Sequence, residues 1–378
     1  MTGLSLDNAL VALGAEAPQQ GEGLSWFVQQ HWPTLVVVGA LVVVTILLLS
    51  FLARFLRLTV NMFLDIPLPM TANLNDYTPP SGEIVSFPSR DGHLLRGMFV
   101  ERPAGAPDRG TIVFCHEFAS DMLSVGRYAT PLVEAGYTVF TFDFRGHGQS
   151  SMPPHYEPRH WPSHHDVNDL RSAIAYVKTR CPIGQSGVGV FGVSRGGAVA
   201  TIAAALSPAV RCLVLDGAFS TDYSIEELMR RWAEIFVARV GSATHPDFVY
   251  RFCRAMTLFY VELKCRCRYP SMRRALAALA QVPALFISGE RDTYVRPEQT
   301  RTLCKLKPGK KELWICPDAK HNQAVAADPQ TYAEKITSFF DHHLPAPAPA
   351  GQSLPAVTDP ALPSPRETLP GRRPARTD

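Results

Sequence analysis

The sequence has almost no excess of either charge sign. Its 378 residues include 37 Lys and Arg against 34 Asp and Glu, which leaves a formal net charge of +3. A protein that holds nucleic acid by bulk positive charge needs a clear basic excess, so the composition excludes that class. Hydrophobic residues make up 46% of the chain and charged residues 19%, so wholesale disorder is excluded too.

Charge is also missing from one long stretch, residues 35–53. At 1.5 Å per residue these 19 residues would span about 28 Å, close to the hydrocarbon thickness of a bilayer. The alternative is a buried core helix, but Val36–Val38 and Val42–Val44 leave no polar face at all. We therefore predict a transmembrane helix over 34–57. A cleaved signal peptide is disfavoured, because no Lys or Arg precedes the apolar run and the run is too long.

The charges that flank this stretch predict its orientation. The charged residues that precede it are all acidic, and Arg54 and Arg57 follow it directly. The positive-inside rule then places the N-terminus outside and the rest of the chain in the cytoplasm. The eight cysteines have irregular spacing, and several lie in apolar strand-like runs, which fits reduced thiols better than disulfide bridges. We expect a single-pass membrane protein with a cytoplasmic catalytic domain.

Composition divides the chain into five segments. A short N-terminal segment (1–33) precedes the membrane helix, and a linker (58–79) follows it. Residues 80–344 have the size of one folded domain, and residues 345–378 hold nine prolines without apolar periodicity. That tail is predicted to be a disordered, proline-rich extension whose protein partners, if any, the sequence does not name.

Within 80–344, short β-branched runs alternate with helix-length segments, which predicts a mainly parallel sheet covered on both faces. The eight predicted strands are Glu83–Phe87, Leu94–Glu101, Thr111–Cys115, Thr138–Asp143, Val188–Val193, Arg211–Leu215, Ala284–Ser288 and Glu312–Cys316. Predicted helices are Val125–Ala135, Asp166–Lys178, Arg195–Leu206, Pro297–Leu306 and Thr331–His343.

The segment Gly192–Gly196 has the pattern G-x-S-x-G. It follows the apolar strand Val188–Val193 and opens a helix of small residues. This strand–turn–helix setting suits a nucleophilic serine on a tight turn, because the two glycines let strand and helix pass closely. We predict Ser194 as a nucleophile rather than a serine that only caps a helix.

A serine nucleophile needs a base oriented by an acid, and both follow in the chain. Asp292 lies in the turn after one predicted strand, and His321 lies in the loop after the next. Carboxyl-end loops of parallel strands share one edge of a sheet, where ligands bind in open α/β folds. Asp216, at another strand end, is the rival acid; we favour Asp292 because its Gly-Glu-Arg-Asp turn better matches an acid loop.

An oxyanion hole requires two backbone N–H groups aimed at the developing negative charge. One is predicted to come from Arg195, directly after the nucleophile. The second is predicted in the loop after the third strand, residues 114–118, with Phe118 as the donor.

Taken together, these segments resemble the α/β-hydrolase-fold serine hydrolases. The likeness covers about 80–344, and its loop Phe142–Ser150 is similar to that of esterases, lipases and proline-iminopeptidase-like enzymes. It implies an eight-stranded, mainly parallel sheet with a helical lid between strands six and seven, here about 220–282. One departure is His116-Glu117, where the family usually has His-Gly. His116 and Glu117 are therefore candidates for substrate binding.

The predicted function is a membrane-anchored serine hydrolase that cleaves an ester or thioester of a small molecule with an apolar acyl part, through a Ser-His-Asp triad and an acyl-enzyme. A serine aminopeptidase or amidase of the same fold is an alternative, as is a catalytically silent scaffold that binds lipid or protein. No cofactor and no metal are expected. Gly187, Gly189 and Gly192 match a dinucleotide fingerprint, but the strand lies among the glycines rather than before them. The adjacent histidines of pairs such as His164 and His165 are expected to diverge on a helix.

Overall fold

The computed structural model describes residues 23–65, 78–181, 187–237 and 247–344. The chain divides into two compact units, residues 1–59 and 60–378. The predicted tail, most of the N-terminal segment and residues 66–77 of the predicted linker lie outside the described residues.

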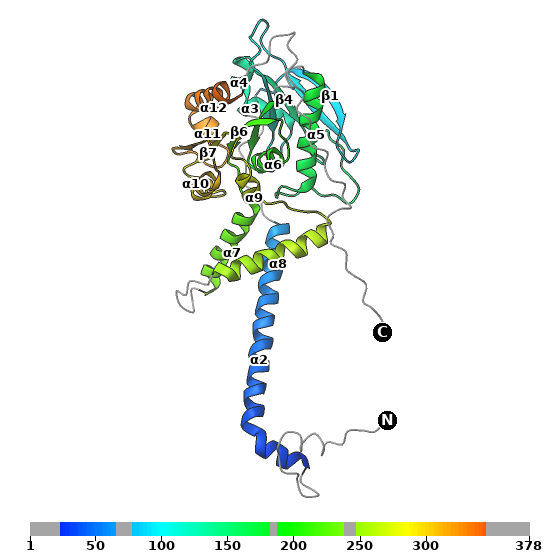
Figure 1. Ribbon diagram of the computed structural model, residues 1–378, viewed down its shortest axis with the longest axis vertical. Helices are drawn as coiled ribbons and strands as arrows, with labels where there is room; N and C mark the ends of the chain where they lie inside the picture. Colours follow the sequence, from blue (N-terminus) through cyan, green and yellow to red (C-terminus); the bar gives the residue numbers. More distant parts are fainter. Residues whose placement is uncertain (1–22, 66–77, 182–186, 238–246, 345–378) are drawn as a thin grey trace. The chain divides into compact units, whose positions relative to one another are not determined.

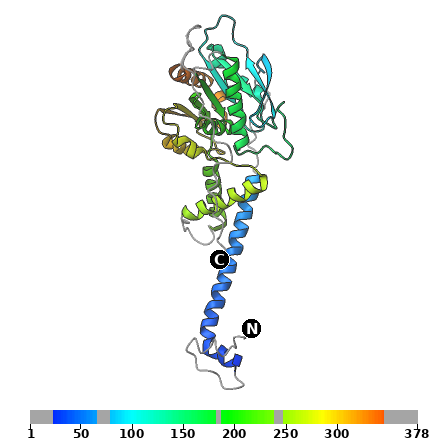
Figure 2. The same cartoon turned by 45° about the vertical axis from the view of Figure 1, so that its right-hand side comes forward.

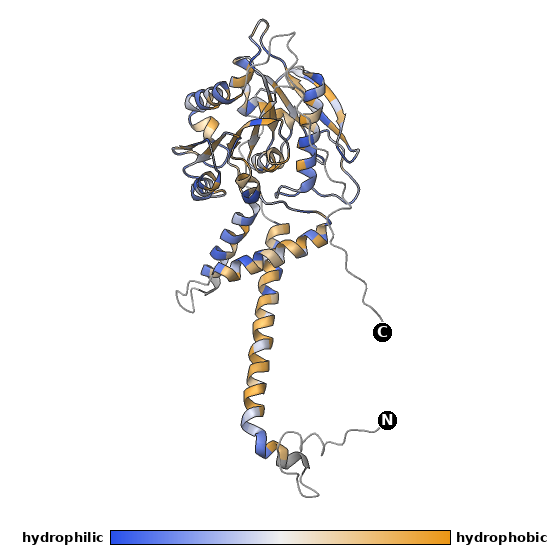
Figure 3. Cartoon of the chain, viewed as in Figure 1, coloured by the Kyte–Doolittle hydropathy of each residue, from blue (hydrophilic) through white to orange (hydrophobic). Residues whose placement is uncertain are grey.

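Helix α2 (Gly23–Leu64) contains the predicted membrane segment and extends beyond it at both ends. Within it, Phe27–Leu64 is long and apolar enough to cross a membrane, with a mean hydropathy of 3.1 in an 18-residue window of which none is buried. Figure 3 shows the hydrophobic colour that follows this helix along most of its length. The predicted linker is corrected at its start, because residues 58–64 are helical; Leu and Val continue the apolar pattern there.

The second unit contains one eight-stranded sheet in the order β1-β2-β4-β3-β5-β6-β7-β8 (Figure 1). The strands are β1 (Gly82–Pro88), β2 (Leu94–Val100), β3 (Thr111–Cys115), β4 (Thr138–Phe142), β5 (Val188–Val193), β6 (Val210–Asp216), β7 (Ala284–Gly289) and β8 (Lys311–Cys316). β1 pairs with β2, and β2 with β4, in antiparallel fashion; all other neighbours are parallel. The predicted mainly parallel, eight-stranded sheet is confirmed.

Helices cover both faces of this sheet, because side chains of the central strands alternate between two apolar layers. In β3, Val113 and Cys115 point into one layer and Ile112 and Phe114 into the other. The first layer is closed by α5 (His164–Arg180), α6 (Arg195–Ala204), α9 (Met272–Ala277) and α10 (Pro297–Leu306). The second is closed by α3 (Val125–Tyr128), α4 (Thr130–Glu134), α11 (Ala324–Ala327) and α12 (Pro329–His343).

One predicted helix is broken in the structure. Val125–Ala135 was expected to be continuous, but it forms a 3₁₀ turn, η1 (Met122–Ser124), followed by α3 and α4. Pro131 stands in the first turn of α4. A proline has no N–H to donate to the carbonyl four residues earlier, here that of Arg127, so the helix is interrupted at Ala129 and restarts at Thr130.

The excursion between β6 and β7 holds α7 (Thr221–Val237) and α8 (Asp247–Cys265), so a helical insertion at the predicted place is confirmed. Both lie outside the layers that enclose the sheet, as Figures 1 and 2 show. The predicted lid over 220–282 is too long at its C-terminal end. Met272 and Leu276 of α9 are buried in the first core layer, because their spacing of four residues gives α9 an apolar face toward the sheet.

The order of strands reverses at β3, whose neighbours are β4 on one side and β5 on the other. In open α/β sheets a crevice forms at the carboxyl ends of the strands where the order reverses, and ligands bind there. The register pairs Cys115, the last residue of β3, with Gly192 of β5. The loop after β3 and the turn that follows β5 therefore meet at this edge.

Candidate active site

Ser194 occupies the sharp turn between β5 and α6. Its φ of 51° and ψ of −116° are unusual for a residue with a side chain, and its N–H donates to the Asp216 carbonyl oxygen at 2.7 Å. The flanking glycines make the turn possible. A Cβ at Gly192 would overlap the backbone of Gly196, and one at Gly196 would overlap the carbonyl of Cys115. Strained backbone of this kind is typical of functional sites.

The structure brings Ser194, His321 and Asp292 together from three loops. The Ser194 Oγ lies 3.0 Å from His321 Nε2, and His321 Nδ1 lies 2.7 Å from Asp292 Oδ2. All three are largely buried, with exposed fractions of 3%, 8% and 3% in the same order. This is the hydrogen-bond chain that an activated serine requires.

Asp292 is held so that one carboxylate oxygen faces His321. Its other oxygen, Oδ1, accepts the backbone N–H groups of Tyr294 and Val295 at 2.9 and 2.8 Å. The rival acid, Asp216, is instead bound by the Tyr332 hydroxyl, which donates to its Oδ2 at 2.9 Å. Burial raises the pKa of Asp216 to about 7. The geometry therefore makes Asp292 the partner of the imidazole, while Asp216 is paired with Tyr332.

The predicted oxyanion donors lie in the two loops that meet at the strand-order reversal. Arg195 is the first residue of α6, so its N–H has no acceptor within the helix. Its side chain points away from the turn: the guanidinium is buried, pairs with Asp166, and lies 5.4 Å from the ring centre of Phe118. Phe118 is half-buried, and its ring also contacts His147 at 5.5 Å. Their roles as donors stay predictions.

His116 and Glu117 require a correction, since neither is placed to meet a substrate. Both are buried, at 0% and 2% exposure. His116 Nε2 accepts the Phe144 N–H, and the Glu117 carboxylate accepts the hydroxyls of Ser124 and Tyr128. Burial raises the pKa of Glu117. Strand β3 ends at Cys115, directly before His116. Both side chains then point into the interior, where they form these hydrogen bonds.

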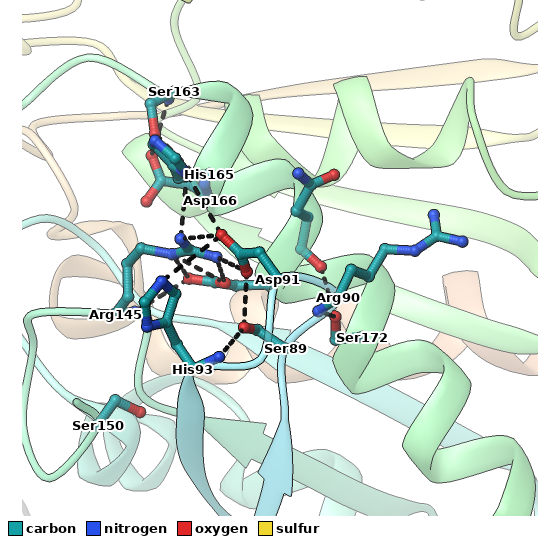
Figure 4. A network of polar contacts seen from close by, with 12 residues as sticks. Ser89, Arg90, Asp91, His93, Arg145, Ser150, Ser163, His165, Asp166 and Ser172 are labelled. Atoms are coloured by element: carbon teal, nitrogen blue, oxygen red, sulfur yellow. Dashed lines mark hydrogen bonds and ion pairs between the residues drawn. The ribbon is translucent and has the colours of Figure 1, made fainter. Parts of the chain in front are cut away.

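The loop after β4 is fixed by a buried polar network around Arg145 (Figure 4). The Arg145 guanidinium is fully buried and contacts Asp91 of the β1–β2 turn and Asp169 of α5, with Nε 3.0 Å from Asp169 Oδ2. It also lies 3.0 Å from His165 Nδ1. The network joins three segments distant in sequence and holds the loop that carries His147 toward Phe118.

A cavity of about 520 Å³ is lined by Thr293, Tyr294 and Val295, the residues that directly follow Asp292. Its volume is within the size range of small-molecule sites. Its lining includes His160, Trp161, Phe219, Leu228, Trp232, Tyr294 and Val295. Tyr294 connects the cavity to the Ser194–His321–Asp292 group, because its ring lies 5.1 Å from that of His321. Ser224, Glu227, Arg231 and Gln299 add polar groups, but most of the lining surface is apolar, so the cavity suits a ligand with an apolar part.

Sequence reasoning missed His160, which stands in an irregular loop without a motif. Its Nε2 lies 3.0 Å from the Tyr294 hydroxyl, and its ring stacks on Phe219 at 4.6 Å. Among the described residues, its buried Nδ1 has no hydrogen-bond partner. Burial lowers the pKa of His160 to about 3, so this imidazole is neutral. This neutral imidazole forms part of the cavity wall and holds the Tyr294 hydroxyl in place.

His164 and His165 do not diverge as expected. Their rings are 3.9 Å apart at the start of α5, and with Cys267 their ligand-type atoms lie within 4.8 Å of one another. The nitrogens already have donors beside them, however. His164 Nδ1 accepts the Arg268 N–H at 3.1 Å, and His165 Nδ1 faces the Arg145 cation. The cluster fits a hydrogen-bonded structural group better than a metal site.

Comparisons with known proteins agree with this architecture. A family model described as alpha/beta hydrolase fold matches residues 110–266. The uncharacterized protein YfhR of Escherichia coli is 26% identical over 267 residues, covering 69% of this chain and 81% of its own length. The uncharacterized protein YqkD of Bacillus subtilis is 23% identical over 269 residues, which cover 68% of this chain and 78% of YqkD.

Among solved structures, the esterase Pf2001 of Pyrococcus furiosus superimposes with a TM-score of 0.53 at 21% identity. The match covers 74% of this chain and 98% of the esterase. The alpha/beta hydrolase GrgF from a Penicillium species gives a TM-score of 0.51 at 18% identity. That match covers 70% of this chain and 99% of GrgF. At such identities the likeness concerns the fold.

Proposed function

We propose that this chain, which has the α/β-hydrolase fold, is a serine hydrolase that cleaves an ester or thioester with an apolar acyl group. One observation carries the proposal: the continuous hydrogen-bond chain from the Ser194 hydroxyl through His321 to Asp292, with distances of 3.0 and 2.7 Å. The fold gives the broad class of hydrolase, and the serine mechanism is inferred from this geometry.

The residues suit a two-step acyl transfer. Ser194 Oγ attacks the acyl carbonyl carbon while His321 Nε2 accepts the hydroxyl proton. The negative charge on the carbonyl oxygen is held by the N–H groups of Phe118 and Arg195. Collapse breaks the bond to the leaving group, to which His321 returns the proton. Water then attacks the acyl-enzyme with the same proton transfers, which releases the acid and restores the hydroxyl.

The cavity supports the choice of an apolar acyl group. Most of its lining surface is apolar, and its one arginine, Arg231, pairs with Glu227. An aminopeptidase would recognise a free ammonium with a carboxylate inside the cavity. Of the two carboxylates in the lining, Glu227 already contacts both Arg231 and Arg296, and Asp65 is exposed to solvent. We therefore place the ester before the amide.

We further infer that α2 anchors the enzyme as a single membrane span, with residues 60–344 in the cytoplasm. The length and hydropathy of Phe27–Leu64 support a span, and Arg54 and Arg57 support the orientation. Protease digestion of intact cells expressing the chain tests this topology. Cleavage of the catalytic unit from outside would contradict the orientation.

A fluorophosphonate probe tests the serine mechanism. The wild-type chain should be labelled, and Ser194→Ala should abolish labelling. Ser338→Ala, which changes an exposed serine of α12, is the matched control and should leave labelling intact. Absence of labelling in the folded wild type would instead favour a silent scaffold. Parallel assays with p-nitrophenyl esters and aminoacyl-nitroanilides separate the esterase from the amidase, with Ser194→Ala as the blank.

A further inference from the structure

The end of α2 is built into the hydrolase unit rather than tethered to it. Phe63 is 2% exposed, and its ring stacks on Trp161 at 4.9 Å and meets Tyr269 edge-on at 4.8 Å. The last carbonyl groups of a helix lack partners within the helix. Here the Trp161 Nε1–H donates to the Phe63 carbonyl at 2.8 Å, and Arg159 donates to the Leu64 carbonyl at 2.9 Å.

The same turn of α2 also borders the cavity beside the triad. Asn61, Met62 and Asp65 line it together with Trp161. A series of ring contacts runs from this turn to the catalytic imidazole: Trp161 to His160 at 5.3 Å, His160 to Tyr294 at 5.3 Å, and Tyr294 to His321 at 5.1 Å. The cavity therefore reaches from Tyr294, whose ring contacts His321, to the last turn of α2.

We propose that Met62 forms part of the acyl-chain site and sets chain-length specificity, and that the substrate is a lipid-like ester with a long acyl chain. Three observations support this. Met62 presents a flexible, apolar thioether to the cavity, which adapts to a hydrocarbon chain. Leu228 and Trp232 of α7 add further apolar wall. The helix that supplies Met62 is itself long and apolar enough to cross a membrane. The inference rests on the proposed serine hydrolase activity.

The test measures kcat/KM of the full chain, in detergent, for p-nitrophenyl esters from acetate to palmitate. Met62→Trp should fill the cavity and lower kcat/KM for long esters about tenfold or more, mainly through KM, while acetate hydrolysis changes little. Met62→Ala should shift the preference toward longer chains. Leu64→Trp is the matched control: Leu64 lies two residues further on the same turn and does not line the cavity.

An unchanged chain-length profile in both Met62 variants, with Ser194-dependent acetate hydrolysis intact, would overturn the inference and leave the proposed function standing. Loss of acetate and palmitate hydrolysis in equal measure would also overturn it, since that result indicates a general disturbance. Absence of any ester hydrolysis by the wild type would overturn the inference together with the proposed function.

A separate observation concerns α8, which has one exposed apolar side. Phe248, Phe252, Phe259 and Leu263 are 51–70% exposed. At 100° per residue they fall within an arc of about 60°. Residues on the opposite side are buried against the rest of the unit: Tyr250, Cys253, Thr257 and Val261. Such a row of large exposed side chains on one helix indicates an interaction surface.

We infer that this side of α8 lies on a membrane surface that contains anionic lipids. The charge around it favours lipid over a protein groove, because exposed Arg251, Lys264, Arg266 and Arg268 surround the apolar row. The nearby carboxylates are engaged within the unit: Asp247 pairs with Arg230, and Glu262 accepts the Tyr269 N–H. An apolar row flanked by cations is the pattern of helices that lie in the bilayer interface.

Limited trypsin digestion of the full chain in vesicles tests this surface, with cleavage after Lys264 and Arg266 mapped by mass spectrometry. Cleavage there should be several-fold slower in phosphatidylglycerol-containing vesicles than in phosphatidylcholine vesicles. Phe259→Ser with Leu263→Ser should remove the protection. Cleavage after exposed Arg301 of α10 is the internal control and should not change. Equal cleavage rates in both vesicle types, or protection that survives the double substitution, would overturn the inference.

Discussion

Replacing either of two aspartates by asparagine should have different effects: Asp216→Asn should raise stability at neutral pH, and Asp292→Asn should abolish most of the activity. Asp216 is 1% exposed and has the Tyr332 hydroxyl as its partner, and burial raises its pKa from 3.8 to about 7. Between about pH 4 and pH 7 the folded state therefore retains a proton that the unfolded chain has released. At about 1.4 kcal/mol per pH unit, the free energy of unfolding falls by about 4 kcal/mol across this window as pH rises.

Asp216→Asn removes this dependence, because the amide is neutral at every pH and can still accept the Tyr332 hydroxyl. From pH 5 to pH 8 the variant should gain about 3 kcal/mol relative to wild type, or on the order of 10 °C in Tm. Scanning fluorimetry across this range measures the gap, with Asp108→Asn as a control at an exposed carboxylate. A Tm gap that does not change with pH would refute the reasoning from burial.

Activity separates the same two residues. Asp292→Asn removes the carboxylate that orients His321 and should lower kcat by about 10⁴-fold. Asp216→Asn should retain most of its kcat at pH 8, because its partner is Tyr332. Measuring kcat of ester hydrolysis for both variants shows which aspartate orients His321. Loss of activity in Asp216→Asn with activity kept in Asp292→Asn would reverse the assignment of the acid.

Three further substitutions test other parts of the fold. Gly196→Ala should lower kcat/KM about 100-fold, because its Cβ would overlap the Cys115 carbonyl and displace the nucleophile turn; ester kinetics of the folded variant measure this. Arg145→Ala should destabilise the chain by about 3–5 kcal/mol in urea unfolding, since it leaves the buried Asp169 without its cation. Lys307→Met should cost about 1–3 kcal/mol by the same measure, because three backbone carbonyls lose the ammonium that donates to them.

Matched changes elsewhere provide the controls. Gly39→Ala adds a methyl group where no atom lies within 4 Å, so the kinetics should not change. Arg180→Ala breaks an exposed pair with Glu83 and should alter stability little. If Arg180→Ala destabilised the chain as much as Arg145→Ala, burial would not explain the effect at Arg145.

Local pattern was enough to predict much of this molecule. The alternation of β-branched runs with helices predicted the eight strands within a few residues, because period and turn residues are properties of adjacent positions. The G-x-S-x-G turn placed Ser194 for the same reason: strand, glycine and helix follow one another in the chain. The uncharged run predicted a long apolar helix, although its ends at Gly23 and Leu64 lie beyond the predicted 34–57.

The tertiary structure alone decided what depends on partners distant in sequence. Asp216 and Asp292 both end strands, and only packing showed that Tyr332 binds one and His321 the other. Glu117 looked available for a substrate until the fold placed hydroxyls of the next helices around it. Likewise, the end of α2 met the loop at Trp161 although 98 residues separate Phe63 from it. Periodicity tells which side of an element is apolar, but it does not tell which distant residue lies against that side.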